Sequence, residues 1–229
     1  MAGHTHFAES TEEYLEAIYR LEREGGGVST SALAADLHVQ PASVSGMLKK
    51  LASDGYLEYE VRSQPKLTRK GLELAVRVIR RNRLAEVFLH DMLGLPWDQV
   101  HEEACRLEHA ISDRVEQRLV AVLGNPQVCP HGHAIPPLDL SEPPRCSLRL
   151  ADALPGSTVR IGSVVEHEAA TLQYLDRVGL RPGTVVEVVE RGPVGGPVTV
   201  QTPNGRAALS LELARMIAVS AEASTALSA

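Results

Sequence analysis

The chain has 229 residues, of which 44% are hydrophobic and 23% are charged. These values are typical of a soluble globular protein with two or three small domains. The net charge of −6 speaks against binding to nucleic acid through overall charge, so any DNA contact must use a locally basic surface.

The sequence carries no mark of export or of a membrane. No apolar run approaches the roughly 20 residues that cross a bilayer. The first ten residues lack the apolar stretch of a signal peptide. Cys105, Cys129 and Cys146 are too few and too scattered for a disulfide framework, and we take Cys146 to be structural. We therefore expect a cytoplasmic protein.

The first 70 residues predict helices and turns followed by a two-stranded ribbon. Apolar residues recur at helical spacing over 11–24, where Ser10 or Thr11 can cap the helix and three glycines end it. The next elements are a helix over 30–37, a turn over 38–40, a helix over 41–54, strands over 56–61 and 66–67, and a helix capped by Thr68. This order is typical of a winged helix-turn-helix.

The helix that begins at Pro41 is the candidate recognition helix. Small polar residues at its start suit base edges, and lysines near its end suit phosphates. Six basic and three acidic residues lie between 49 and 70, a local positive excess in a negative chain. The candidate DNA-binding residues are Thr30, which can also cap its helix, and Gln40, Pro41, Ala42, Ser43, Ser45, Lys49, Lys50 and Arg62. The alternative is a structural winged helix that binds protein, but the charge reversal favours DNA.

The rest of the chain predicts long helices, a connector and a small β domain. The helices cover about 68–93 and 96–123, and six prolines between 125 and 144 exclude a helix there. The expected strands cover 158–165, 184–190, 198–202 and 206–210, with a short helix over 169–178. About five short strands in some 65 residues suggest an SH3-like barrel.

The predicted fold class is therefore α+β. We expect a winged helix-turn-helix domain over 1–70, an all-helical dimerisation and metal-binding domain over 71–124, a proline-rich connector over 125–153, an SH3-like small β-barrel over 154–220 and a disordered tail over 221–229.

Metal-binding side chains recur within the second long helix. His101, Cys105, Glu108 and His109 span an arc of roughly 100° on a helix, which is one face. Burying such polar groups unpaired costs about 1–3 kcal/mol each, and a bound cation removes that cost. One helix rarely completes a coordination sphere. Glu13 and Glu16 are the leading partners, although by themselves they would be read as a solvated acidic face. Glu86 on the preceding helix, taken alone, is unremarkable.

A second group of soft ligands lies in the connector. Cys129 and His131 are two residues apart in a proline-containing turn, which can chelate an ion, although many such pairs are incidental. A metalloprotease is a weaker alternative: His101 and Glu102 begin like the His-Glu-x-x-His helix, but Cys105 stands where the second histidine belongs. We therefore expect no catalytic residues and no enzyme activity.

These residues resemble one family over nearly the whole chain. The segments that carry the resemblance are Thr11–Arg23, the winged helix, Arg83–Glu86, His101–Asp113 with its Cys-Arg-x-Glu-His core, Cys129–Gly132 and Leu175–Gly183. The chain resembles the iron- and manganese-dependent transcriptional repressors of the diphtheria toxin repressor and manganese transport regulator type. The Cys-Arg-x-Glu-His segment is highly specific, whereas the SH3-like domain also occurs elsewhere.

The resemblance implies a primary metal site made by Cys105, Glu108 and His109 with a side chain of the first helix. That position is Met in iron-type members and Asp in manganese-type members, and here it is Glu13. Glu16 matches a bridging acid of manganese-type members, whereas Cys105 is typical of the iron type. Because a carboxylate favours a harder ion than a thioether does, we expect Mn(II), with Fe(II) as the alternative.

The resemblance also implies a secondary metal site. Iron-type members place His where this chain has Asn82, although Glu86 and His101 remain. Some manganese-type members instead use the Cys and His of a Cys-Pro-His-Gly loop, here Cys129 and His131, with an acid of the C-terminal domain. Glu168 is the candidate acid, and Glu166 and His167 are near enough to compete.

The implied function is a metal-sensing repressor of metal-uptake genes. A homodimer with recognition helices about 34 Å apart predicts a palindromic double-stranded operator, bound by one dimer or two. Two alternatives stand beside it. One is a winged-helix regulator that responds to an organic ligand, and the other is a metal-storage or trafficking module.

Overall fold

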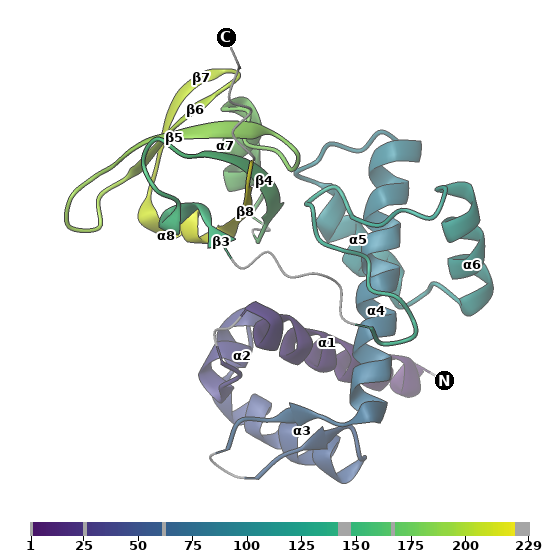
Figure 1. Ribbon diagram of the computed structural model, residues 1–229. Coiled ribbons are helices and arrows are strands. Elements are labelled where there is room, and N and C mark those ends of the chain that lie inside the picture. The colour runs from purple at the N-terminus through teal and green to yellow at the C-terminus, as the bar shows by residue number, and fades with distance from the viewer. Residues whose placement is uncertain (1, 25–26, 61–62, 142–147, 166–167, 223–229) are drawn as a thin grey trace. The chain divides into compact units, whose positions relative to one another are not determined.

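The computed structural model describes the chain except for residues 1, 25–26, 61–62, 142–147, 166–167 and 223–229. The chain forms two compact units. The first comprises residues 1–82, 108–111 and 136–142, and the second comprises 83–107, 112–135 and 143–229. Figure 1 labels the helices and strands of both units.

The first unit is a winged helix-turn-helix, as predicted. Its elements are α1 (Ala2–Glu24), α2 (Thr30–Asp36), α3 (Pro41–Ser53), β1 (Leu57–Glu58), β2 (Lys66–Leu67) and the start of α4 (Arg69–Val87). The two strands pair antiparallel. Leu15, Ile18, Leu33, Leu48 and Leu51 form the centre of its core and are fully buried. These residues are the apolar positions of helical periodicity, so each helix turns one face inward.

Two of the predicted helix caps are wrong. α1 begins at Ala2, so Ser10 and Thr11 lie inside the helix and do not cap it. α2 is capped by Ser29, whose hydroxyl accepts a hydrogen bond from the backbone of Ala32, and Thr30 is the first helical residue. The cap by Thr68 is confirmed, since its hydroxyl accepts from the Gly71 amide at 3.1 Å.

The second unit contains the remaining helices. α4 passes into a π-helical turn, η1 (Phe88–Met92), and α5 (Val100–Glu108) and α6 (Asp113–Val122) follow. The single helix expected over 96–123 is therefore wrong. Ser112 has extended backbone angles and its hydroxyl accepts from the Val115 amide, so it starts a new helix. As a result, α5 ends at Glu108, and His109 lies in the following turn.

The C-terminal part of this unit is a small β-barrel-like sheet with strand order β3-β8-β4-β5-β6-β7. The strands are β3 (Leu148–Arg149), β4 (Thr158–Val164), β5 (Val185–Arg191), β6 (Val198–Thr202), β7 (Gly205–Leu209) and β8 (Ile217–Ala221). Three helices accompany them, namely η2 (Leu150–Asp152), α7 (Ala169–Arg177) and α8 (Leu211–Met216). The fold class is confirmed, but β3, α8 and β8 were not predicted.

The predicted disordered tail over 221–229 includes the last residue of β8. That residue, Ala221, instead pairs with Val159 of β4. Its sequence, Ile-Ala-Val-Ser-Ala, is too short and too rich in small residues to be distinguished from a coil by pattern alone. No helix among the described residues is both long and apolar enough to cross a bilayer.

Candidate metal centres and DNA-binding face

The first candidate metal centre lies in the first unit, where α1 meets residues 108–111. The Nδ1–H of His109 donates to the Glu12 carboxylate at 2.6 Å. The other ring nitrogen, Nε2, lies 3.2 Å from the Glu108 Oε1 atom. The hydrogen bond to Glu12 raises the pKa of His109 and so favours a positive charge on the ring. When the ring is neutral, Nε2 carries a lone pair, and a proton or a metal ion is needed between it and the Glu108 carboxylate.

The Glu108 carboxyl group lacks the partners that a buried acid requires. Its side chain is 3% exposed, and its Oε2 atom has no hydrogen-bond partner. Burial, followed by the negative charge of Glu16, raises the pKa of Glu108 to about 9. Asn82 donates a hydrogen bond that opposes this rise in part. In the absence of a cation, Glu108 is therefore protonated at neutral pH.

The predicted partners on α1 lie beside this pair. Glu13 is exposed and Glu16 is half-buried, and both add negative charge at Glu108. Glu12 is not among the predicted ligands, and the contact of Asn82 with Glu108 was not expected either. Glu12 could have been recognised, because residues 12 and 16 are one turn apart and share a face of the helix. The site thus gathers more carboxylates than were predicted.

The predicted ligand Cys105 lies in the second unit. It stands one turn before Glu108 on α5, and its thiol is 3.6 Å from Nε2 of His101. The other nitrogen of His101, Nδ1, donates to Glu86 at 3.1 Å. His101 thus joins Cys105 to the second candidate metal centre, since Glu86 belongs to that centre.

The second candidate metal centre consists of Glu86, Cys129 and His131, whose ligand atoms lie within 4.8 Å of one another. All three side chains are buried. The Nε2–H of His131 donates to the Trp97 carbonyl at 3.1 Å, so Nδ1 carries the lone pair when the ring is neutral. This Nδ1 lies 3.3 Å from Glu86 Oε1 but forms no hydrogen bond of proper geometry. A proton or a metal ion on this nitrogen would offset the charge of the Glu86 carboxylate.

The charges of this centre also favour a cation. Burial opposes ionisation of Glu86, but the imidazoles of His101 and His131 outweigh it and hold the pKa of Glu86 well below its usual range. Burial, together with the charge of Glu86, raises the pKa of the Cys129 thiol. A carboxylate is therefore enclosed beside a protonated thiol, and an ion that displaces the thiol proton would neutralise the site.

The loop that carries Cys129 and His131 is held against β4. The backbone carbonyl of His131 accepts from the Val164 amide at 3.0 Å, and the His133 ring donates to the Val164 carbonyl at 3.0 Å. Burial, with the charge of Arg83, lowers the pKa of His133 to about 3, so this histidine is neutral and structural. Gly132 has φ +82°, and a side chain there would collide with the Gly162 carbonyl.

Glu168, the predicted acid of the second centre, is exposed at the start of α7 and accepts a hydrogen bond from Thr171. It is not part of the cluster of three ligands. The competing candidates Glu166 and His167 lie outside the described residues.

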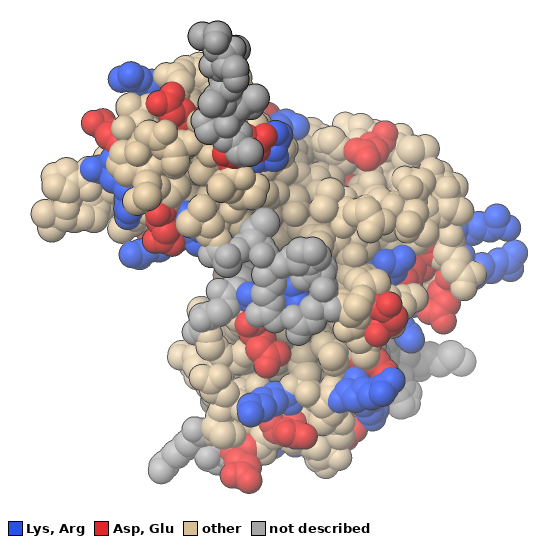
Figure 2. Space-filling model, in the orientation of Figure 1, with Lys and Arg blue, Asp and Glu red and all other residues tan. Residues whose placement is uncertain are grey.

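The recognition helix presents most of its predicted residues to solvent. Gln40, Pro41, Ala42, Ser43, Lys49 and Lys50 are exposed, whereas Thr30 and Ser45 are half-buried and Arg62 lies outside the described residues. The Ser45 hydroxyl donates to the Pro41 carbonyl at 3.2 Å. On the face drawn in Figure 2, basic and acidic side chains are mixed over the first unit rather than gathered into one patch.

Three family descriptions match this architecture in order along the chain. "Iron dependent repressor, N-terminal DNA binding domain" matches residues 6–64, "Iron dependent repressor, metal binding and dimerisation domain" matches 68–137, and "FeoA domain" matches 148–221. A winged helix followed by buried metal-ligand clusters and a small barrel defines the class of metal-dependent DNA-binding regulators.

Individual relatives cover almost the entire chain. The iron-dependent repressor IdeR of Mycobacterium leprae is 35% identical, with 92% of this chain and 96% of the relative aligned. The diphtheria toxin repressor of Corynebacterium jeikeium is 34% identical, with 79% and 85% covered. A solved manganese-dependent transcriptional repressor in complex with manganese superimposes with a TM-score of 0.86 at 31% identity, covering 93% of this chain and all of that one. The chain belongs to the iron-dependent repressor family and is a metal-dependent transcriptional repressor.

Both clusters fit a divalent cation by the chemistry of their side chains. Each contains an orphaned buried polar atom, Glu108 Oε2 in one and His131 Nδ1 in the other. The first offers carboxylates and one imidazole, a set that suits a hard ion. The second adds a thiol and is therefore softer.

Proposed function

We propose that Mn(II), with Fe(II) as the alternative, activates this repressor, and that the loaded homodimer binds a palindromic operator of metal-uptake genes in the cytoplasm. One observation carries the proposal: Nε2 of His109 lies 3.2 Å from Oε1 of the buried Glu108 carboxyl, and carboxylates of α1 add negative charge around this pair. A cation bound there would replace the proton of Glu108 and offset the negative charges. The proposed primary ligands are Glu13, Glu16, Cys105, Glu108 and His109, to which Glu12 is added.

The mechanism follows from the elements that these residues join. Without a cation, Glu108 keeps its proton and the glutamates of α1 repel one another. His109 and the carboxylates of Glu108 and α1 would hold the cation, which would fix α1 to the end of α5 within the first unit. α1 packs on the helix-turn-helix core, so this constraint orders the helices that carry the DNA-reading residues. Metal and DNA binding are then reciprocally coupled, typically by about 1–3 kcal/mol.

The choice of Mn(II) rests on the donor atoms. The first centre is dominated by carboxylate oxygens, which suit Mn(II), whereas the position of Glu13 is occupied by a softer thioether in iron-type members. Anaerobic DNA-binding titrations with Mn(II) and Fe(II), at measured free-metal concentrations, test this preference. If Fe(II) activates DNA binding at a tenfold lower free concentration than Mn(II) does, the proposed preference for Mn(II) is wrong.

A selection experiment tests the function itself. Random-sequence duplex DNA is selected with the metal-free protein plus Mn(II), and the enriched sequences are then tested for binding with and without chelator. We expect a palindrome whose half-sites are about one helical turn apart and whose binding requires the ion. Metal-independent binding would favour the regulator of an organic ligand, and tight metal binding without DNA selection would favour the storage module.

A change in the second centre should reduce the number of bound ions. We expect Cys129→Ser to lower the metal content at saturation by one ion per chain, because the serine hydroxyl is a weaker ligand for this ion than the thiolate it replaces. The proposed secondary residues are Glu86, Cys129 and His131, with His101 and Glu168 as further candidates. Elemental analysis after dialysis measures the count, and Cys146→Ser serves as the matched control. An undiminished ion count in Cys129→Ser would remove the loop from the metal chemistry.

Two substitutions in α3 should separate phosphate contacts from base reading. We expect Lys49→Ala to weaken binding to all DNA sequences and to reduce the salt dependence by about one ion per protomer. Ser43→Ala instead should relax preference at one base pair with the salt dependence unchanged. Fluorescence anisotropy at several salt concentrations distinguishes them, and identical behaviour of the two variants would contradict the orientation of α3.

The proposed dimer surface lies on the second unit. Val115 and Val122 of α6 are 46% and 61% exposed. Together with Phe88, Leu119 and two arginines they line a hollow of about 330 Å³. Large apolar side chains grouped in this way are typical of an interface with another chain.

A further inference from the structure

The second metal centre is enclosed, so an ion needs a route to it. Glu86, Cys129 and His131 are each at most 3% exposed. A pocket of about 250 Å³ lies next to the centre, and of its three ligands only Cys129 lines that pocket. Other walls are formed by His90, Asp91, Trp97, Val128 and Arg181. All of these residues belong to the second unit.

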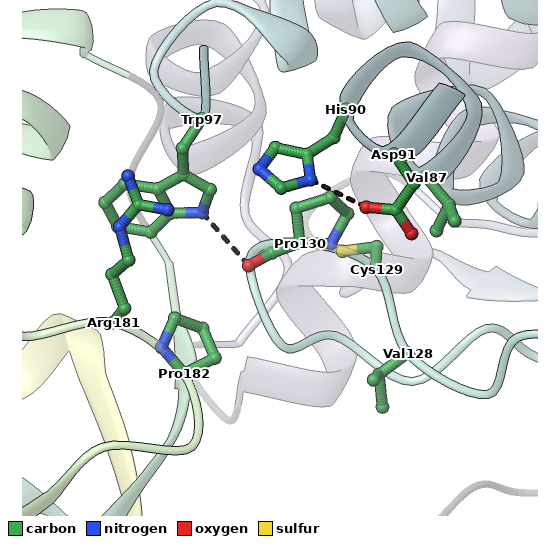
Figure 3. A pocket seen from close by; sticks show the side chains of 9 residues that line it. All are labelled: Val87, His90, Asp91, Trp97, Val128, Cys129, Pro130, Arg181 and Pro182. Carbon is green, nitrogen blue, oxygen red and sulfur yellow. Dashed lines mark hydrogen bonds and ion pairs between the residues drawn. The ribbon is translucent and has the colours of Figure 1, made fainter. Parts of the chain in front are cut away.

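One wall of the pocket carries a histidine prepared to receive a metal ion. The Asp91 carboxylate lies 2.7 Å from Nδ1 of His90, and because a carboxylate accepts, Nδ1 must carry the hydrogen. In the neutral ring, Nε2 then carries the lone pair that can bind a metal ion. Figure 3 shows this nitrogen directed away from Asp91, into the hollow between His90 and Trp97. An imidazole held through its other nitrogen by a carboxylate is the common arrangement of metal-ligating histidines.

The solvent exposure of His90 and Asp91 suits transient capture of a metal ion rather than permanent binding. The side chains of His90 and Asp91 are 32% and 57% exposed, so they lie where the pocket meets solvent. Cys129 is on the same side of the hollow, and Trp97 and Arg181 are across from it (Figure 3). Arg181 is paired with Asp176 and stacks over the Trp97 ring, so its charge is held at the opposite wall. His90 and Cys129, the two side chains proposed to bind the ion, therefore lie on the same wall of the pocket, opposite the charge of Arg181.

We propose that this pocket is the entry route for the second metal centre, and that His90, oriented by Asp91, captures a divalent transition-metal ion and passes it to Cys129. The inference rests on the proposed function, since it assumes that Glu86, Cys129 and His131 hold an ion. His90 is a transient ligand, and the equilibrium site is complete without it. The rates of loading and release should therefore depend on the pair, whereas the number of bound ions should not.

Trp97 provides the readout, since it is the only tryptophan of the chain. Its ring is 5.4 Å from the ring of His131 and lines the pocket. Stopped-flow mixing of metal-free protein with Mn(II) or Co(II) then follows loading through tryptophan fluorescence. Cys129→Ser identifies which kinetic phase belongs to the second centre, because that phase should disappear in this variant.

Two variants of different kinds test the route. His90→Ala with Asp91→Asn should slow the second-centre phase about tenfold, in the range by which local ligands and charge raise encounter rates. Val128→Phe, at a 54% exposed position on the pocket wall, should slow loading and chelator-induced release alike by narrowing the mouth, and it leaves Trp97 as the only tryptophan. Glu212→Gln removes one exposed carboxylate outside the pocket and controls for net charge.

The outcomes separate this inference from the proposed function. Slower rates in both variants with an unchanged ion count support the route. If both variants retain the second-centre phase, identified by its loss in Cys129→Ser, and its rate is unchanged in both, the route is overturned. The second centre then remains supported. A reduced ion count in the His90 variant also overturns it, because His90 would then be a resident ligand. If Cys129→Ser changes neither the count nor any phase, the second centre itself fails.

Discussion

Replacing Glu108 by glutamine is expected to abolish metal-dependent DNA binding while leaving the metal-free protein folded. Burial and the charge of Glu16 raise the pKa of Glu108 to about 9, so the carboxyl is protonated without a cation. The amide of glutamine has nearly the same shape and is likewise neutral. The free energy of unfolding without metal should therefore change little, since no buried charge is added or removed.

The loss of metal affinity in Glu108→Gln should be large. Removing an outer-shell partner of a metal ligand typically costs about 10- to 100-fold in affinity, and removal of a ligand carboxylate should exceed this. Isothermal titration with Mn(II) measures the affinity, and denaturant unfolding of the metal-free protein measures stability. Glu116→Gln is the matched control, because Glu116 is also a buried glutamate, 5% exposed, but lies on α6 in the other unit.

If Glu108→Gln binds Mn(II) and operator DNA as tightly as the parent chain, the first centre is misassigned. If the variant instead unfolds without metal while the parent chain stays folded, Glu108 is ionised in the metal-free protein, and the pKa argument fails.

A charge placed on α6 should dissociate the dimer and with it the operator complex. Val115→Glu puts a carboxylate into the proposed interface, and an uncompensated buried charge typically costs about 3–5 kcal/mol. The smaller value corresponds to a roughly 100-fold weaker dimer. In a two-fold symmetric interface each copy contributes its own carboxylate, so the charges also repel each other.

Analytical ultracentrifugation and operator binding with Mn(II) measure both consequences. The matched control is Val194→Glu, because Val194 is fully exposed on the turn between β5 and β6 and lies on another part of the same unit. The control should remain dimeric and bind DNA. A Val115→Glu protein that stays dimeric at micromolar concentration would place the interface elsewhere.

Much of the candidate site could be predicted from the sequence because its proposed ligands recur at helical spacing. Cys105 and Glu108 are one turn apart, and so are residues 12 and 16, so a periodic pattern is enough to place each pair on a common face. The winged helix was predictable for the same reason, since its caps and turns are local signals. Ser29 and Thr30 are adjacent residues of a kind that can each cap a helix, and the sequence pattern does not distinguish them. The predicted cap, Thr30, was therefore wrong.

Tertiary structure alone decided which side chains face each other in the two centres. Nothing in the spacing of residues 12, 82 and 109 shows that Glu12 orients the His109 ring or that Asn82 donates to Glu108, because these contacts join segments distant in the chain. The same holds for His131, whose tautomer depends on the carbonyl of Trp97, 34 residues away.

The sequence by itself thus determined the fold class, the helical faces and the types of ligand, because these follow from local periodicity and from side-chain chemistry. Only the tertiary structure decided which carboxylates lie beside which imidazole, which ring nitrogen donates to a neighbouring group, and that each centre encloses a buried polar atom without a hydrogen-bond partner. Hydrogen-bond partners and burial are set by long-range packing, and no short stretch of sequence encodes them.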